Sequence, residues 1–269
     1  MKKILLVACA MAFSACDDGG GADLGAPLDL SVPDLPVTLR DLRACTAPTF
    51  AGFSGASDVE RRVDCSLCGC VIDPLTAIGP TALWAKTQVS ATFTDNTSGV
   101  IIFADGSSGP AFATLSSQYP TGPFFLDGDF DLRLDYTVFS LPTGGKIALR
   151  VGLGNSVPFW EIARAHPVGG ADGYADQLGP TSAALAGGSA TGTLRLTRTG
   201  FTIVASADGV EVGRTLSGTA ARVTLFVAVG VDGCAGDGGL ANDDGGAACR
   251  VGAELRALRL ASGALVDRP

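Results

Sequence analysis

Histidine and glutamate are scarce in this sequence. Its 269 residues include one histidine, His166, and four glutamates, Glu60, Glu161, Glu211 and Glu254. One imidazole is too few for a multi-histidine metal centre, and four glutamates limit the carboxyl pairs that acid/base catalysis uses. A serine hydrolase with a nucleophile elbow is also excluded, because the sequence contains no Gly-x-Ser-x-Gly.

Long helices and excess positive charge are missing as well. The 37 glycines and 14 prolines are spread along the chain without a collagen period, which excludes a helical bundle. The net charge is -8, and loss of Lys2 and Lys3 with a signal segment would bring it to about -10. An acidic chain repels phosphate backbones, so no nucleic acid is expected as a partner. The hydrophobic share of 46% is nevertheless enough for a packed core.

The first residues have the pattern of an export signal. Two lysines precede a short apolar run that ends at Phe13, and small residues then precede Cys16. The run is too short to cross a bilayer. Phe13-Ser14-Ala15-Cys16 resembles the lipobox of bacterial lipoproteins, which implies acylation of Cys16 and a lipid anchor to a membrane of the bacterial cell envelope, on its periplasmic face or outer surface. An ordinary signal peptide is the alternative.

Composition divides the rest of the chain. After a signal peptide of residues 1–15, residues 16–44 are rich in glycine, proline and aspartate and predict an unstructured stalk behind the lipidated cysteine. Residues 45–78 form a cysteine-rich segment, expected as a small cap on the main domain. Residues 79–262 are expected to form that domain, and residues 263–269 a C-terminal tail.

Export to an oxidising compartment favours disulfides among the six remaining cysteines. Cys234 and Cys249 flank a Gly/Asp-rich loop and are expected to pair with each other. The other four would then form two bridges near the N-terminus: Cys45, Cys65, Cys68 and Cys70. A four-cysteine zinc site is the alternative for this cluster.

From Thr81 onward, short alternating runs are separated by turn residues. This pattern predicts an all-β domain, a two-sheet antiparallel β-sandwich or a barrel. The expected strands are Leu83–Phe93, Val100–Ala104, Phe112–Leu115, Phe124–Leu126, Asp129–Phe139, Lys146–Leu153, Phe159–Arg164, Gly192–Arg198, Phe201–Ala207, Val210–Thr215, Arg222–Val231 and Arg250–Leu260.

Turn residues set the expected register between neighbouring strands. A turn at Thr199-Gly200 would place Leu196 opposite Ile203, and one at Asp208-Gly209 would place Ala207 opposite Val210. The strands Asp129–Phe139 and Lys146–Leu153 are expected to form a hairpin. That hairpin would place Leu134 beside Val151 on one face and Asp135 beside Arg150 on the other.

The segments Gly192–Gly209 and Gly128–Tyr136 resemble the strand-turn-strand modules of concanavalin A-like lectin/glucanase jelly rolls. The resemblance covers about residues 80–262 and implies a two-sheet sandwich whose concave face binds saccharide in many relatives, often with a calcium ion near one rim. Catalytic members use a Glu-x-Asp-x-x-Glu strand. The sequence has no such strand, so the resemblance favours binding over catalysis.

Candidate ligand-binding residues gather within a short stretch. Trp160 or Tyr174 could stack on the apolar face of a sugar ring, and Glu161 and His166 could bind its hydroxyl groups. Packing in the core is the alternative for Trp160 and the expected role of Trp84.

Aspartates suggest a calcium site and a carboxyl pair. Oxygen donors for calcium are expected at Asp237, Asp243 and Asp244, between Cys234 and Cys249. The alternative donors are Asp105 and the run Asp127, Asp129 and Asp131. Asp129, Asp131 and Asp135 share one face of a strand and could also pair with Glu161 as in a glycosidase, but a solvated strand face, interrupted by Arg133, is the favoured explanation.

Two functions remain open at this point. One is a lipid-anchored, non-catalytic module that binds polysaccharide. The other is a structural or adhesion lipoprotein that binds protein or envelope components and has no sugar site. A glycoside hydrolase is disfavoured, because the sequence lacks the catalytic strand of the resembling enzymes.

The lipid anchor leads to a first prediction. Changing Cys16 to Ser should yield soluble, unlipidated protein, because two or three acyl chains on one residue anchor a protein stably and none would remain. The measurement is partition into a detergent phase. Partition that survives the change would contradict acylation at Cys16.

Overall fold

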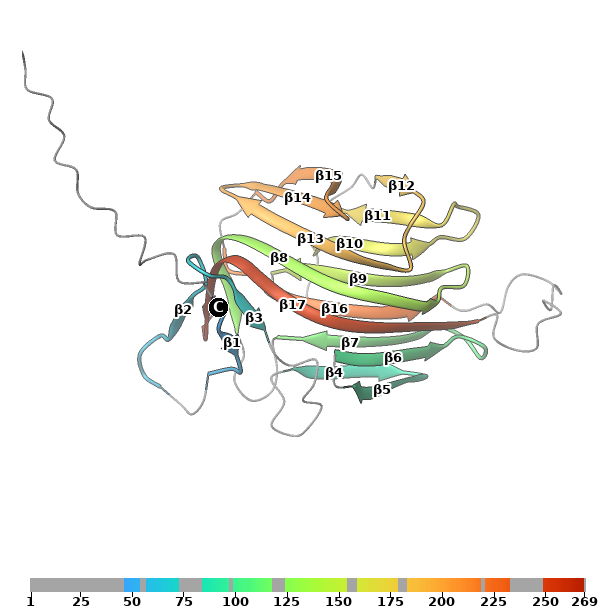
Figure 1. Ribbon diagram of the computed structural model, residues 1–269, viewed down its shortest axis with the longest axis horizontal. Coiled ribbons are helices and arrows are strands. Elements are labelled where there is room, and N and C mark those ends of the chain that lie inside the picture. The colour runs from blue at the N-terminus through green and yellow to red at the C-terminus, as the bar shows by residue number, and fades with distance from the viewer. Residues whose placement is uncertain are drawn as a thin grey trace, which may run out of the picture. The chain divides into compact units, whose positions relative to one another are not determined.

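The computed structural model describes residues 46–53, 57–72, 84–96, 99–117, 124–153, 159–178, 183–218, 221–232 and 249–268. These ranges form seventeen β-strands (Figure 1). Within them we find no helix of the length and apolarity that crossing a bilayer requires. The expected all-β, two-sheet antiparallel sandwich is confirmed.

Two sheets make up the sandwich. The ten-stranded sheet has the order β1-β3-β17-β8-β13-β14-β15, with β2 and β6 pairing with β17 and β5 pairing with β6. Its strands are β1 (Thr49–Phe50), β2 (Arg62–Asp64), β3 (Cys70–Ile72), β5 (Ala91–Asn96), β6 (Gly99–Asp105), β8 (Phe125–Ser140), β13 (Thr191–Thr199), β14 (Thr202–Ala207), β15 (Val210–Leu216) and β17 (Arg250–Val266).

The seven-stranded sheet lies behind it in Figure 1, in the order β12-β11-β10-β9-β16-β7-β4. Its strands are β4 (Ala85–Val89), β7 (Ala111–Ser116), β9 (Gly145–Gly152), β10 (Phe159–His166), β11 (Gly173–Gln177), β12 (Ala184–Ala186) and β16 (Thr224–Val231).

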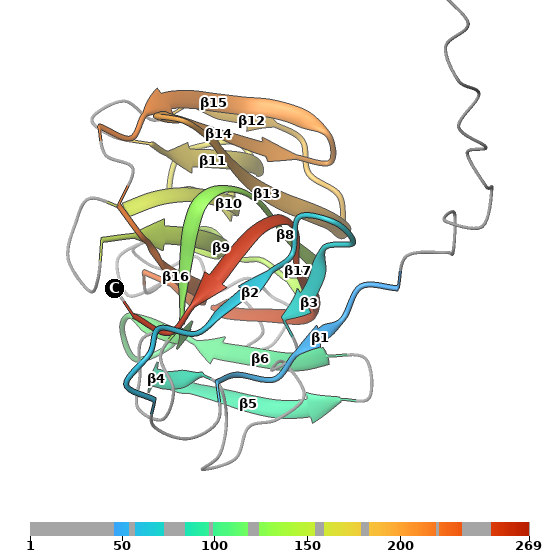
Figure 2. The ribbon, with the colours of Figure 1, turned by 90° about the vertical axis from the view of Figure 1, so that its left-hand side faces the viewer.

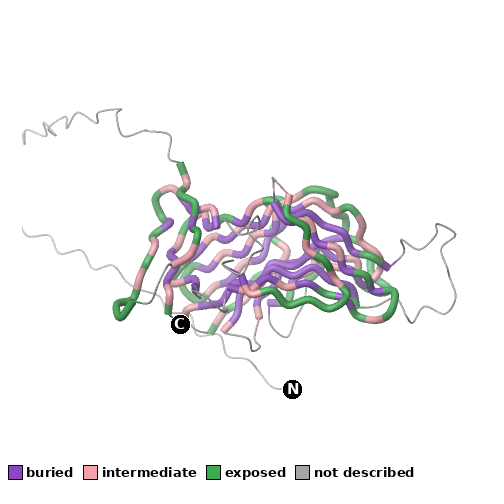
Figure 3. The backbone as a smooth tube through the Cα atoms, turned by 90° about the horizontal axis from the view of Figure 1, so that it is seen from below, coloured by how far each residue is buried: buried purple, intermediate pink, exposed green. Residues whose placement is uncertain are grey.

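The core lies between the two sheets. Alternate residues of each strand point inward, and the buried set includes Leu132 and Leu134 of β8, Leu149 of β9 and Val227 of β16. Figure 3 shows buried residues concentrated along the middle strands, with exposed residues towards the loops and edges. Trp84 is also in this core, 3% exposed, in T-shaped contact with Phe124, as expected.

The expected hairpin between Asp129–Phe139 and Lys146–Leu153 is wrong. β8 pairs with β13 and β17, whereas β9 pairs with β10 and β16 in the other sheet. Leu134 and Val151 are both fully buried, so the faces were assigned correctly. The loop at residues 141–144 carries the chain across the sandwich instead of turning it back. Asp135 therefore pairs with Arg259, and Arg150 with Glu161.

One expected strand is divided between the sheets. The run Leu83–Phe93 becomes β4 and β5, which belong to opposite sheets. They are separated at Ser90, whose φ of 48° lies in the left-handed region that strands do not use. Conversely, two expected strands become the single strand β8; they are Phe124–Leu126 and Asp129–Phe139.

The register of the β13–β14–β15 meander is partly as expected. The Asp208-Gly209 turn is confirmed: both residues have positive φ, as a type I′ turn requires, and Ala207 pairs with Val210. The preceding turn is displaced by one residue. Thr199 pairs with Thr202, so Leu196 faces Ala205 instead of Ile203.

The cysteine-rich segment is part of the main sheet and not a separate cap. β2 and β3 pair with β17 (Figure 2), and Phe50, Cys65 and Cys70 belong to the main core. Nor do residues 263–266 form a tail, because β17 continues through Val266. Beyond it, Asp267 forms an ion pair with Arg61 at 2.6 Å.

Arg198 closes one end of the core. Its side chain is 2% exposed and lies over the Phe130 ring, 5.1 Å from its centroid. The guanidinium donates to the carbonyl oxygens of Gly128 and, at 2.7 Å, Ala221. Burial lowers the pKa of this arginine below its ordinary value.

We therefore expect Arg198→Met to lower the free energy of unfolding by about 2 kcal/mol, because charge-assisted bonds to two carbonyls are lost. Urea unfolding measures the effect. Arg195→Met is the matched control on the same strand; its side chain is 40% exposed, and it should cost under about 1 kcal/mol. Equal losses in the two variants would contradict the assigned role of Arg198.

A third prediction concerns acid stability. Burial raises the pKa of Asp131, but hydrogen bonds from Arg133 and Arg195 outweigh it, so that its pKa lies below the ordinary value. A carboxyl whose pKa is lowered by folding stabilises the fold above its unfolded pKa and loses that contribution as the pH falls through its folded pKa. Asp131→Asn should therefore be less stable at pH 7, by about 1 kcal/mol. The free energy of unfolding should also fall less steeply below about pH 4 in the variant than in the wild type. Parallel curves for the two proteins would contradict this.

Candidate functional site

The outer face of the seven-stranded sheet, which points away from the ten-stranded sheet, carries unusually small side chains. The pairing registers place one residue from every strand in a continuous row across the sheet. This small-residue row consists of Thr87, Thr114, Ala228, Ala148, Ala163, Ala175 and Ala184. Seven strands make the row about 30 Å long.

The two rows beside it contain aromatic and charged residues among further small ones. On one side lie Val89, Phe112, Gly230, Lys146, Ala165, Gly173 and Ala186. On the other lie Ala85, Ser116, Phe226, Arg150, Glu161 and Gln177. We call the small-residue row the floor of this face. Polar and aromatic side chains lie on both sides of it.

Three charged side chains meet across this floor. Glu161 accepts a hydrogen bond from Arg150 Nε, and its Oε1 lies 3.7 Å from Lys146 Nζ. The side chain of Glu161 is 8% exposed, against 22% for Arg150 and 36% for Lys146. The acid therefore lies at the bottom, and the two cations are the parts that a ligand would meet.

An exposed aromatic residue, Phe112 of β7, lies towards the β4 end of the same face. Phe112 and Val89 are register partners and are 39% and 44% exposed. The next position in the row is Gly230, where an added Cβ would lie 3.1 Å from Phe112 Cβ. Glycine at this position thus allows Phe112 to pack closely against the backbone of β16. Phe159 and Phe226 form a second aromatic contact nearby, with ring centroids 5.5 Å apart.

The four residues expected to bind ligand do not form one site. Trp160 and Tyr174 are 3% and 5% exposed and belong to the inter-sheet core, so the expected aromatic platform is wrong. His166 is half-buried at the end of β10, with Nδ1 3.3 Å from the carbonyl oxygen of Leu141. Glu161 alone faces outward, because neighbouring residues of a strand point to opposite faces.

Tyr174 links the sheets instead. Its hydroxyl lies 3.0 Å from that of Tyr136 and donates to Asp208, which also accepts from the backbone N–H of Thr193 at 2.8 Å. Arg164 lies over its ring, 5.8 Å from the centroid. Burial, and after it the bond to Tyr174, raises the pKa of Tyr136, so this hydroxyl stays neutral. These contacts are structural.

The disfavoured alternative of a carboxyl pair with Glu161 is not present in the structure. Asp131 and Asp135 belong to the ten-stranded sheet and Glu161 to the seven-stranded one, and their outer faces point in opposite directions. Asp131 is bound by Arg133 and Arg195, and Asp129 accepts from the N–H of Gly200 at 2.7 Å.

Calcium has no candidate site in the described part of the chain. No group of three or more potential ligand side chains occurs there. Among the alternative donors, Asp127 is held by Arg62 and Arg222, and Asp105 accepts from the N–H of Ser107. The expected donors Asp237, Asp243 and Asp244 lie outside the described residues, as do Cys16 and the stalk.

Disulfides are present among the cysteines. Cys65 and Cys70 are bonded to each other. Cys68 is in a disulfide as well, and so is Cys249. Three cysteines of the N-terminal cluster are thus oxidised and supply no thiolate to zinc. Cys45 and Cys234 lie outside the described residues.

Phe112, Lys146 and Arg150 were missed as site residues by reasoning from the sequence. The alternation of apolar and polar residues did show that Lys146 and Arg150 share the polar face of their strand. What the sequence does not show is which strands become neighbours, and only that places Phe112 and Glu161 on the same surface.

Comparisons with known proteins concern the fold. No family model and no curated protein matches the chain. Among solved structures, SCLam, a non-specific endo-beta-1,3(4)-glucanase of family GH16, is 11% identical with a TM-score of 0.52, over 78% of this chain and 95% of that one. The metal-free carbohydrate recognition domain of Emp46p is 11% identical with a TM-score of 0.49, over 72% and 96%.

A third similar structure is the carbohydrate-binding module CBM66 of Bacillus subtilis, 13% identical with a TM-score of 0.38 over 64% of this chain and 92% of that one. At such identities the likeness bears on architecture alone. The chain has a two-sheet antiparallel β-sandwich similar in fold to that of SCLam.

Proposed function

We propose that this protein binds a polysaccharide across the outer face of the seven-stranded sheet and does not cleave it. The observation that carries the proposal is the small-residue row, about 30 Å long, which is bordered by the exposed Phe112 and by Lys146 on one side and by Arg150 on the other. A floor of this length suits an extended polymer better than a single sugar.

The borders of the floor supply the two kinds of contact that sugars use. The phenyl ring of Phe112, which is 39% exposed, can pack against the apolar C–H face of a sugar ring. Guanidinium and ammonium groups donate hydrogen bonds to hydroxyl or carboxylate oxygens. Both contacts are available without rearrangement, because the ion pairs to Glu161 already hold the cations in position.

Binding without cleavage is supported by the state of Glu161. A glycosidase needs two carboxyl groups about 5 Å apart, or about 6.5–9.5 Å apart for inversion. Among the described residues of this outer face, Glu161 is the one carboxylate, and it is engaged by two cations. A group held in that way is poorly suited to act as a proton donor.

We further propose that lipid on Cys16 holds the domain at the bacterial cell envelope, with residues 16–44 as a spacer. The n-region, apolar run and small residues before Cys16 support this part of the proposal. A tethered binding module would keep polysaccharide close to the cell.

The test is a glycan array on the full chain in detergent, followed by affinity measurements with the best polysaccharide. Phe112→Ala should raise Kd about tenfold, because a stacking contact is lost. Phe201→Ala is the matched control: Phe201 is 58% exposed and lies at the β13–β14 turn of the other sheet. Its Kd should not change.

Two results would overturn the proposal. One is the absence of any glycan ligand, which would favour an adhesion or structural lipoprotein. The other is an equal effect of Phe112→Ala and Phe201→Ala. Appearance of new reducing ends on prolonged incubation would refute the non-catalytic part alone.

A further inference from the structure

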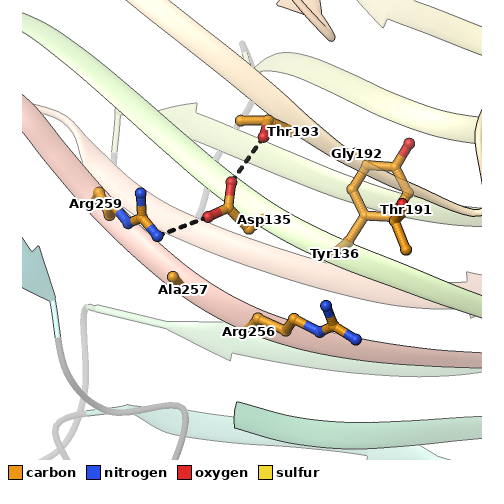
Figure 4. A pocket seen from close by; sticks show the side chains of 8 residues that line it. All are labelled: Asp135, Tyr136, Thr191, Gly192, Thr193, Arg256, Ala257 and Arg259. Carbon is orange, nitrogen blue, oxygen red and sulfur yellow. Dashed lines mark hydrogen bonds and ion pairs between the residues drawn. The ribbon is translucent and has the colours of Figure 1, made fainter. Parts of the chain in front are cut away.

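The ten-stranded sheet has a depression of its own on the opposite surface of the molecule (Figure 4). Its volume is about 600 Å³, within the range of small-molecule sites. The lining residues come from three adjacent strands: Asp135 and Tyr136 of β8, Thr191, Gly192 and Thr193 of β13, and Arg256, Ala257 and Arg259 of β17. None of them belongs to the seven-stranded sheet.

An irregularity in strand pairing creates the depression. Leu255 pairs with Tyr136 and Ala257 with Asp135, so Arg256 is an extra residue with no partner on β8. Such a bulge re-aims a side chain and bends its strand. Ala257, opposite Asp135, is too short to fill the space between the two arginines. The backbone geometry of β17 therefore creates the depression.

The acidic side chains at the depression are less exposed than the arginines that they bind. Arg256 Nε lies 2.9 Å from Glu254 Oε2, and Arg259 Nη2 lies 3.0 Å from Asp135 Oδ2. The side chains of the two acids are 6% and 29% exposed, whereas those of Arg256 and Arg259 are 49% and 57% exposed. A ligand that approaches from solvent therefore meets the guanidinium groups first.

The acids also fix the arginines in place. Asp135 accepts a hydrogen bond from Thr193 Oγ1 at 2.7 Å while it holds Arg259, as the dashed lines of Figure 4 show. Glu254 accepts from Asn96 Nδ2 at 2.9 Å while it holds Arg256. Each guanidinium has five N–H donors, and these ion pairs engage Nε of one and Nη2 of the other.

We propose that this depression is a second ligand site, specific for a carboxylate-bearing sugar such as a uronic acid unit. Guanidinium groups match the planar geometry of a carboxylate, and the hydroxyls of Thr191 and Thr193 on the facing strand suit sugar hydroxyls. The site is separate from the floor on the seven-stranded sheet and does not depend on it.

The experiment is calorimetric titration of the full chain with trigalacturonic acid and, in parallel, with neutral galactotriose. Binding should occur for the acidic trisaccharide, with a preference of at least fivefold, and should weaken as the salt concentration rises. Arg256→Gln and Arg259→Gln should each weaken it at least threefold, and the double variant should abolish measurable binding.

Two control variants test whether the acidic trisaccharide binds in this depression. Arg214→Gln removes an arginine of the same sheet with similar exposure, 59%, which pairs with Glu211 outside the depression; it should leave the affinity unchanged. Phe112→Ala, on the opposite outer face, should also leave it unchanged. If Phe112→Ala abolishes the binding, or the double arginine variant binds as well as wild type, the proposal is wrong. Equal affinity for the neutral sugar would also overturn it.

Discussion

The pairing of β8 with β17 is the interaction on which the rest of the sandwich depends. These strands of 16 and 17 residues run antiparallel from Phe125 opposite Val266 to Ser140 opposite Gly252. Along its other edge β17 carries β6, β3 and β2 in turn, so one strand joins the N-terminal strands to the main sheet. Its bulges bend it to follow all four partners, and one of them creates the depression at Arg256.

Alternation along the strands explains why the two outer faces differ. Both sheets use one parity of residues for the shared core, which leaves the other parity free to vary. On β8 that parity reads Asp131, Arg133 and Asp135, a ladder of charges suited to water. On β9 and β10 it includes three alanines, Ala148, Ala163 and Ala165, together with the charged residues Lys146, Arg150 and Glu161. The alanines Ala148, Ala163 and Ala228 are 0%, 2% and 5% exposed and form a small apolar cluster separate from the core between the sheets.

The sequence predicted more of the fold than of the site, and the reason is geometric. Period-two alternation identified the inward residues of β8 and β9 correctly, since it depends only on local backbone geometry. It did not reveal which sheet each strand joins. A loop of four residues can turn back or cross a 10 Å sandwich, and Leu134 and Val151 are buried either way. Because the sites depend on which strands are neighbours, that ambiguity also misplaced Asp135 and Arg150.

A shared electrostatic arrangement connects the two outer faces. On one, buried Glu161 holds Lys146 and Arg150; on the other, buried Glu254 holds Arg256. In each case the acid is buried and the cation is the more exposed partner, in a chain whose net charge is -8. A net charge counts the two partners of an ion pair equally, although a molecule at the surface mainly contacts the exposed partner. The net charge of this protein therefore does not describe which charged groups its two outer faces expose.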